Sequence, residues 1–435
     1  MELIYSDYKR EYEFLAGMKR RAGEIGLSTN EAVLSIISEV KEKGDAAVRN
    51  FGLKFDGAAP EHFEISKEEM RAAYEGADEA LKKALCHAKE NIETYHERQV
   101  REGYEIRKDK GVVLGQLVRP LARVGIYVPG GTAAYPSTVL MNAVPARIAG
   151  VEEIVMVTPP MILTGQDGTK VCKANPDILA AAYLAGVDRV FLAGGAQAVA
   201  ALTFGTASFP VVDKIVGPGN VFVAAAKKLL FGQVDIDMIA GPSEILVIAD
   251  QEANPVYIAA DLMSQAEHDV MASAVLLTTS EELATKTLEE ITRQKELLSR
   301  KEIINQSLEN FGAVIICGSM EVMIRLANEI APEHLELMVR EPLQYLPLIK
   351  NAGSVFCGEY APEPLGDYLS GTNHVLPTSG TARFSSPLGV DSFLKKMSYT
   401  YYTREALADD QEDIVALADK EGLDAHANSV KVRFL

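Results

Sequence analysis

Short apolar runs alternate with helix-forming segments twice along this chain, and this alternation constrains its fold more than any other feature. Strands that are apolar throughout, each followed by a helix, are typical of parallel sheets covered on both faces. The sequence therefore predicts an α/β protein with two Rossmann-like, doubly wound domains. The apolar runs lie at 124–128, 153–157, 189–193 and 214–216 in the first series, and at 244–249, 273–278, 313–317 and 354–357 in the second.

The remaining segments are expected to attach to these two domains. Residues 1–27 are predicted to form an N-terminal helical segment, and residues 388–435 a small C-terminal helical tail. Residues 28–123 and 244–387 are grouped as a first α/β domain, and residues 124–243 form a second. The tail carries little apolar mass, so it is expected to dock on something larger because it cannot bury a core of its own.

Two capping boxes predict helix starts within residues 28–123. Residues 28–31 (STNE) and 66–69 (SKEE) have the spacing at which a Ser hydroxyl and a Glu carboxylate satisfy free backbone N–H groups. The first helix is expected to run to Gly44, a typical C-terminal stop, and the second leads into a long helical stretch that ends near Val100.

Composition and charge narrow the function classes. A formal net charge of −18 repels phosphate backbones and anionic lipid headgroups, which argues against nucleic-acid and membrane-surface partners. The first residues lack the apolar core of a signal peptide, and no run of about 18 apolar residues could span a membrane. The four cysteines contain no CxxC pair and indicate no disulfide framework, so a reducing, cytoplasmic location is expected.

Glycine-rich turns follow three of the predicted strands, at residues 129–132 (PGGT), 194–197 (GGAQ) and 217–220 (GPGN). Such turns expose backbone N–H groups at a helix start, where anions bind, and open parallel sheets place their ligands at this edge. None of the three matches the G-x-G-x-x-G fingerprint followed by an acidic ribose ligand. The sequence therefore predicts a phosphate or dinucleotide site here, and bare turns are the alternative interpretation.

Gln265 and His268 stand three residues apart at the end of a predicted helix that starts after Asn254. On a helix this spacing brings two Cβ atoms within about 5–6 Å of one another. An amide oxygen and an imidazole nitrogen could then hold one metal ion. The alternative interpretation is a polar helix end with a solvated histidine.

Glu333 and His334 place an acid beside an imidazole in a loop made rigid by Pro332. Such a loop is a suitable mount for a general base and its partner, although adjacent side chains need not point the same way. Four more residues are candidate ligands or bases, and each of them alone could be an ordinary surface residue. They are Asp367, His374, Glu421 and His426.

A nucleophilic cysteine is a competing hypothesis, because aldehyde oxidation can run through a thiohemiacetal on a thiol. Cys317 and Cys357 end two of the apolar runs. No cationic residue that would lower a thiol pKa lies nearby in sequence, so the favoured interpretation is a small buried hydrophobe at a strand end.

Taken together, the motifs resemble those of the histidinol dehydrogenase family, in the same order and without a missing segment from about residue 123 to residue 426. The N-terminal third is also similar to that family. The matching segments are RVGIYVPGGTAAYPSTVLMNAVPA, GGAQAVAALTFGT, VDKIVGPGN, DMIAGPSEILVIAD, SQAEHD, APEHLEL, PLGDYLSGTNHVLPT and EGLDAHANSV.

The resemblance implies a zinc-dependent enzyme that oxidises L-histidinol to L-histidine by way of L-histidinaldehyde, with two NAD+, in the last steps of histidine biosynthesis. It implies the metal ligands Gln265, His268, Asp367 and His426. Two imidazoles and two oxygens are chemically reasonable for zinc, with positions left for the imidazole and amine nitrogens of the substrate.

The resemblance also assigns further roles and a partner. It implies a homodimer in which the tail of residues 388–435 completes the active site of the other subunit, and it makes residues 124–243 the NAD-binding domain. The acid/base pair would be Glu333 and His334, and the NAD contacts Tyr127, Gln197 and Asn220. The substrate contacts would be Ser243, Gln265, His268, His334, Asp367, Glu421 and His426.

Two alternatives stay open at this point. A relative with the same fold could oxidise another small alcohol, such as a sulfonated diol, although Glu421 and His426 suit a substrate with an imidazole and an ammonium group. A non-catalytic nucleotide-binding or metal-buffering protein is the second alternative, and it predicts that neither Glu333 nor His334 matters for any activity.

Overall fold

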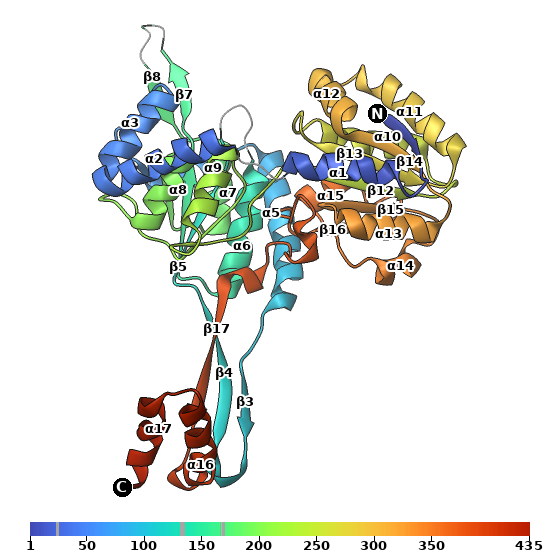
Figure 1. Cartoon of the computed structure of the whole chain (residues 1–435). Coiled ribbons are helices and arrows are strands. Elements are labelled where there is room, and N and C mark those ends of the chain that lie inside the picture. The colour runs from blue at the N-terminus through green and yellow to red at the C-terminus, as the bar shows by residue number, and fades with distance from the viewer. Residues whose placement is uncertain (23–25, 131–134, 166, 168–169) are drawn as a thin grey trace.

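Two α/β units lie side by side, and a long arm projects from them (Figure 1). The structure is a computed structural model and describes residues 1–22, 26–130, 135–165, 167 and 170–435. One sheet is built on the first series of apolar runs and the other on the second, and we call the two bodies the 124–243 unit and the 244–387 unit. The doubly wound α/β fold expected from the alternation is confirmed.

The 124–243 unit is centred on a six-stranded sheet with the order β11-β10-β5-β6-β9-β2. Its strands are parallel except for β2, which runs antiparallel to β9. Alternate residues of a strand point to opposite faces, and the central strands are apolar at successive positions, so both faces of the sheet are apolar. The strands are β2 (Glu64–Ile65), β5 (Arg123–Tyr127), β6 (Glu153–Thr158), β9 (Arg189–Leu192), β10 (Lys214–Val216) and β11 (Asp235–Ile236).

Helices cover both faces of this sheet. One face packs against α2 (Leu27–Lys43), α3 (Asp45–Phe55), α8 (Gly195–Phe204) and α9 (Val221–Leu230). The other face packs against α4 (Lys67–Gly76), α5 (Glu79–His96), α6 (Pro136–Ala149) and α7 (Pro176–Ala185). A short hairpin of β7 (Met161–Thr164) and β8 (Lys170–Lys173) extends from its edge.

The 244–387 unit is centred on a parallel sheet with the order β1-β14-β13-β12-β15-β16. Its strands are β1 (Glu2–Tyr5), β12 (Glu244–Ala249), β13 (Ser273–Thr278), β14 (Gly312–Ile316), β15 (His334–Met338) and β16 (Ser354–Cys357). One face packs against α10 (Pro255–Ala266), α11 (Glu281–Lys295) and α12 (Lys301–Phe311), and the other against α1 (Arg10–Ala22) and α13 (Met320–Ile330). Two short helices, α14 (Pro342–Tyr345) and α15 (Glu363–Tyr368), follow the last two strands.

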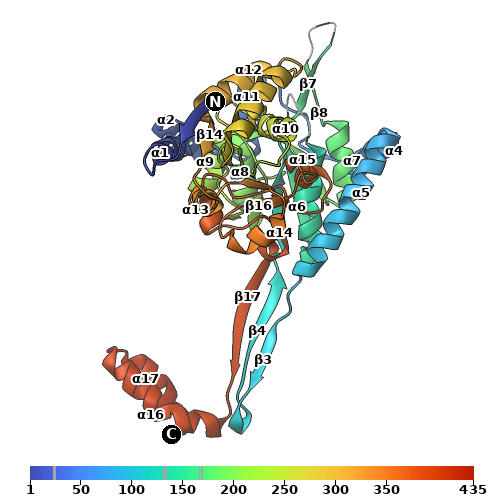
Figure 2. The ribbon, with the colours of Figure 1, turned by 90° about the vertical axis from the view of Figure 1, so that its right-hand side faces the viewer.

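The arm is a three-stranded antiparallel sheet that carries two helices at its far end (Figure 1; Figure 2). Its strands are β3 (Tyr104–Arg107), β4 (Val113–Pro120) and β17 (Leu394–Tyr401), and its helices are α16 (Arg404–Lys420) and α17 (Asp424–Lys431). In both views the two helices stand away from both α/β units. Among the described residues, no helix combines the length and the apolar character needed to cross a bilayer.

The N-terminal segment differs from the expected helix in one respect. Helix α1 is present, but Glu2–Tyr5 form a strand that pairs in parallel with β14 at the edge of the 244–387 sheet. Four residues are too few for a periodic pattern, so a helix and a strand cannot be told apart there from the sequence.

The grouping of residues 28–123 with residues 244–387 differs from the packing that the structure shows. Helices α2 to α5 pack on the 124–243 sheet, and β2 extends that sheet. The buried side of α2 carries Val33, Ile36 and Val40. An apolar stripe of this kind indicates that a helix face is buried, but it does not indicate which sheet covers it.

One of the two expected capping boxes forms. Ser66 Oγ accepts the Glu69 N–H at 3.1 Å, and Glu69 Oε2 accepts the Ser66 N–H at 2.9 Å. The box expected at residues 28–31 does not form, because α2 begins two residues earlier than a Ser28 cap requires, with Gly26 as its N-cap and no side-chain cap bond. The expected helix end at Gly44 is confirmed.

Candidate active site

A cavity of about 280 Å³ lies between the two units. The 124–243 unit contributes Pro129 and Pro218, which follow strands β5 and β10. The 244–387 unit contributes Ser243 and His334, which lie at the starts of strands β12 and β15. The cavity therefore joins the carboxyl edge of one parallel sheet to the amino edge of the other. Its other lining residues are Tyr135, Thr138, Gly219, Gln265, His268, Glu333, Glu363, Asp367 and His374.

His334 is a buried imidazole with one nitrogen held by the backbone. Its Nδ1 lies 3.0 Å from the carbonyl oxygen of Glu244, so Nδ1 carries the proton and Nε2 keeps a free lone pair. Nε2 is buried and has no hydrogen-bond partner. Burial lowers the pKa of His334 to about 4. The imidazole is therefore neutral near pH 7 and can accept a proton at Nε2.

Glu333 precedes His334 and points into the same buried space. Its Oε2 accepts the backbone N–H of Glu244 at 2.9 Å and lies 3.7 Å from His334 Nδ1. Burial raises the pKa of this carboxyl well above its usual range. Once ionised, such a carboxylate is a stronger base than an exposed glutamate. The structure thus brings the predicted acid/base pair together, with both side chains anchored to the backbone of one residue at the start of β12.

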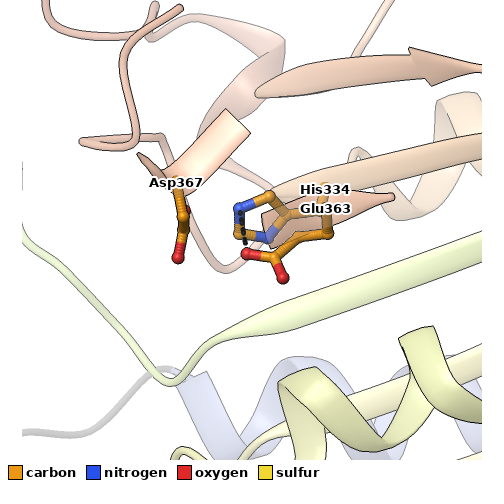
Figure 3. Close-up of side chains that lie close together, drawn as sticks. All are labelled: His334, Glu363 and Asp367. Carbon is orange, nitrogen blue, oxygen red and sulfur yellow. Dashed lines mark ion pairs between the residues drawn. The ribbon is translucent and has the colours of Figure 1, made fainter. Parts of the chain in front are cut away.

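Two carboxylates of helix α15 face His334 (Figure 3). Glu363 Oε1 lies 3.6 Å from His334 Nε2, and ligand atoms of His334, Glu363 and Asp367 lie within 4.8 Å of one another. Burial, followed by the nearby Asp367, raises the pKa of Glu363 to about 9. Three groups of this kind at such distances could hold a metal ion.

Gln265 and His268 reach the same cavity from the end of α10. Gln265 is buried, its Nε2 lies 3.3 Å from His334 Nδ1, and its Oε1 has no hydrogen-bond partner. His268 follows the last turn of the helix and is exposed. An unpartnered amide oxygen and an accessible imidazole thus line the same cavity, and their role as metal ligands stays a prediction.

Glu363 is a site residue that the sequence reasoning missed, and His374 is one to which it gave no definite role. Glu363 stands four residues before Asp367, which places both carboxyls on one side of α15. This four-residue spacing is the sequence signal from which Glu363 could have been identified. His374 Nδ1 lies 3.1 Å from the backbone oxygen of Asp367 and 3.9 Å from its Oδ1, so the imidazole supports the aspartate. Burial lowers the pKa of His374.

The predicted NAD contacts lie at the carboxyl edge of the 124–243 sheet, outside the cavity described above. The hydroxyl of Tyr127 accepts the Gly195 N–H at 2.9 Å, and Gln197 Oε1 is buried without a partner. Asn220 caps α9 by accepting the N–H groups of Phe222 and Val223. Residues 131–132 of the first glycine turn lie outside the described residues.

Glu421 and His426 do not reach the cavity within one chain. Both are exposed at the far end of the arm, Glu421 directly after α16 and His426 in α17 (Figure 1). The other predicted metal and substrate residues do line the cavity, namely Ser243, Gln265, His268, His334 and Asp367.

Neither cysteine proposed as a nucleophile lines the cavity. Cys317 is buried, and burial raises the pKa of its thiol to about 12. Burial also raises the pKa of Cys357. A thiol with a raised pKa carries little of the reactive thiolate at neutral pH, so both behave as small apolar residues.

A neutral buried imidazole, an adjacent buried acid and side chains that could hold a cation form a site suited to proton transfer. Comparison with known proteins gives the family. The family model for histidinol dehydrogenase matches residues 19–434. The chain therefore belongs to the histidinol dehydrogenase family and is an oxidoreductase.

The relatives cover nearly the whole chain. Histidinol dehydrogenase of Clostridium acetobutylicum is 57% identical over 422 residues, which are 97% of this chain and 96% of the relative. Histidinol dehydrogenase of Lactococcus lactis subsp. lactis is 52% identical over 431 residues, 98% of each chain. The crystal structure of histidinol dehydrogenase from Elizabethkingia anophelis is 39% identical and superposes with a TM-score of 0.91, covering 100% of this chain and 98% of that one.

Proposed function

We propose that this chain is a zinc-dependent enzyme that oxidises L-histidinol to L-histidine by way of L-histidinaldehyde, with two NAD+, in histidine biosynthesis. One observation carries the proposal. Three polar atoms of the cavity are buried without a partner: Gln265 Oε1, His334 Nε2 and Glu363 Oε1. Each unsatisfied buried group costs about 1–3 kcal/mol, so their convergence supports a ligand that satisfies them.

Zinc fits the donors that the cavity offers. We assign the ion to Gln265, His268 and Asp367, with His426 supplied by a second copy of the chain. We keep His334 out of the ligand set because an imidazole whose Nε2 binds a metal has no lone pair there to accept a proton. When bound, zinc would hold the imidazole and amine nitrogens of the substrate and so orient the reacting carbon.

In the first oxidation, Nε2 of His334 accepts the hydroxyl proton of histidinol while the carbon gives a hydride to NAD+. This yields the aldehyde and one NADH. In the second, the carboxylate of Glu333 takes a proton from water, and the oxygen of that water attacks the aldehyde carbon. A second hydride then leaves to another NAD+, and the carboxylate product forms. Ser243 would contact the substrate from the loop before β12.

NAD is assigned to the carboxyl edge of the 124–243 sheet, with contacts from Tyr127, Gln197 and Asn220. The support is the unpartnered Gln197 Oε1 and the two glycine turns that start α8 and lead into α9. Parallel sheets bind nucleotides at this edge, and helix starts favour anions. The nicotinamide would reach the cavity past Pro218 and Gly219, which line it.

The arm is assigned to a homodimer. Glu421 and His426 are exposed and far from the cavity of their own chain, yet both suit a substrate with an imidazole and an ammonium group. We propose that each tail completes the site of the other subunit. Mixing His426→Ala with His334→Ala protein should restore part of the activity, because one hybrid site is then intact. No recovery after verified subunit exchange would contradict the shared site.

The decisive experiment measures NADH formed per histidinol consumed, together with the metal content of the purified protein. Two NADH per histidinol and about one zinc per subunit are expected. One NADH per substrate would contradict the second oxidation, and no turnover of histidinol would favour a relative that oxidises another alcohol. Unchanged activity in Glu333→Ala and His334→Ala would favour a non-catalytic protein.

A further inference from the structure

A buried ion pair in the 124–243 unit holds one residue of a cavity-lining loop from both sides. Lys227 of α9 and Asp237, which follows β11, form a salt bridge, and their side chains are 3% and 1% exposed. Lys227 Nζ also donates to the carbonyl oxygen of Gly217 at 3.0 Å, and Asp237 Oδ2 accepts the N–H of the same glycine at 2.8 Å.

Gly217 needs this support because its backbone conformation is restricted to glycine. Its φ is +104°, and a Cβ at this position would lie 2.2 Å from the carbonyl oxygen of Tyr127. Glycine also loses the most conformational freedom when it is fixed. The next two residues, Pro218 and Gly219, line the cavity. The two bonds to Gly217 therefore fix the start of the cavity wall.

Asp237 also bonds to the segment that connects the two units. Its Oδ1 accepts the N–H of Met238 at 2.6 Å. Residues 237–243 connect β11 to β12, and Ser243 at their end lines the cavity. The Asp237 carboxylate thus bonds both to the loop that forms the cavity wall of the 124–243 unit and to the segment that leads to the 244–387 unit.

Packing alone does not explain a buried pair of this kind. Taking two charges out of water costs free energy, and apolar side chains of similar volume are often as stable or more stable. The neighbouring core of α8 and α9 is built from Ala, Val and Leu. Lys227 and Asp237 differ from these apolar neighbours in that they can bond to the backbone of Gly217.

We infer that Lys227 and Asp237 are positioning residues for the oxidation, which fix the 217–219 loop so that NAD binds in register with the substrate. This inference rests on the proposed placement of NAD at the carboxyl edge. We expect the pair to affect the affinity for NAD and not the chemical steps, because neither side chain lines the cavity.

The test uses the double variant Lys227→Met/Asp237→Leu, which removes both charges and leaves no unpaired one. We expect a modest fall in melting temperature, because the Gly217 N–H and carbonyl lose their partners, in a protein that stays folded at the assay temperature, and a KM for NAD+ raised about tenfold. The KM for histidinol should stay within about twofold. The Lys227→Gln/Asp237→Asn variant also carries no charge, keeps a donor for the Gly217 oxygen and an acceptor for the Gly217 N–H, and should retain a KM for NAD+ closer to the wild-type value.

The matched control is a second ion pair of the same unit. Arg147 and Asp188 form a salt bridge, and Arg147 also donates to the backbone oxygen of Gly186, but this pair does not line the cavity. The Arg147→Met/Asp188→Leu variant should leave both KM values unchanged.

Three outcomes would overturn the inference. These are an unchanged KM for NAD+ in the 227/237 double variant, an equal rise in both KM values, and a loss of activity that follows a loss of folded protein. Calorimetric titration of the wild type with NAD+ separates this failure from failure of the proposed function. If the wild type binds no NAD+, the proposed function fails. If it binds NAD+ and the double variant binds it equally well, only the inference fails.

Discussion

The two α/β units contribute different chemical groups to one cavity. The 244–387 unit contributes ionisable side chains at the amino edge of its sheet, and His334 and Glu333 are fixed there by the backbone of Glu244. The 124–243 unit contributes Pro129, Pro218 and Gly219 from turns at the carboxyl edge of its sheet, and Gly217 beside them has a positive φ. One unit therefore suits proton transfer and the other suits close approach of a ligand to the backbone.

This difference shows that the edge of a parallel sheet does not determine the type of site. Ligands of open α/β sheets are expected at the carboxyl ends of the strands, and the 124–243 unit follows that rule. In the 244–387 unit the amino ends form the site, because α10 runs back along the sheet and brings Gln265 to that edge. Substitutions in the two units should therefore change different kinetic constants.

The largest effect is expected in the 244–387 unit. His334→Ala removes the base at Nε2, so kcat should fall by about 10²–10⁴-fold, with zinc content and melting temperature retained. Steady-state kinetics measure kcat, metal analysis measures the zinc content, and thermal denaturation measures the melting temperature. His87→Ala, at an exposed position outside the cavity, is the control and should leave kcat unchanged. A kcat within about threefold of the wild-type value would show that His334 is not the group that accepts the proton.

A substitution in the 124–243 unit should act on NAD+ affinity. Gly195 has a φ of +67°, and a Cβ there would lie 2.7 Å from Gln197 Oε1. Gly195→Ala should raise the KM for NAD+ about tenfold and change the KM for histidinol little. Gly186→Ala is the matched control, since Gly186 has a φ of +73° but lies between α7 and β9, at the amino edge of the sheet. Equal kinetic effects in the two variants would indicate general backbone strain.

Removing the metal should make stability depend on pH through the 244–387 unit. The pKa of Glu363 is raised to about 9, so its contribution to stability is fully present below the usual carboxyl pKa. That contribution is lost as pH rises toward 9. The melting temperature of chelator-treated protein should therefore decrease as the pH rises from about 6 to about 9.

Two comparisons test this assignment. Glu363→Gln should flatten the slope, because the amide does not ionise. Added zinc should raise the melting temperature, because it binds the folded protein. A slope that is identical in wild type and Glu363→Gln would assign the pH dependence to other groups.

The smallest effect is expected for Tyr127→Phe in the 124–243 unit. The change removes the hydroxyl that accepts the Gly195 N–H but keeps the buried ring. The loss of one hydrogen bond is worth about 0.5–1.5 kcal/mol, so the KM for NAD+ should rise by about three- to tenfold. No change in that KM would show that the Gly195 turn holds its position without the tyrosine.

Much of the fold and part of the site follow from local sequence patterns. Apolar runs such as 153–157 must be buried on both faces, and the sequence places them between helices, which predicts parallel sheets. The capping box at Ser66 has its own partners within three residues. Glu333 and His334 were recognisable because they are adjacent, and Gln265 and His268 because they lie three residues apart.

Other features were decided only by the tertiary structure. The apolar stripe of α2 required burial, but the choice of the 124–243 sheet depends on contacts between residues far apart in sequence. The partnership of Glu363 with His334 also spans such a distance, and no local pattern encodes it. Local propensity and periodicity act within a few residues, so they determined the strands, turns and helices. Which sheet edges meet, and which side chains face one another there, depends on packing across the whole chain.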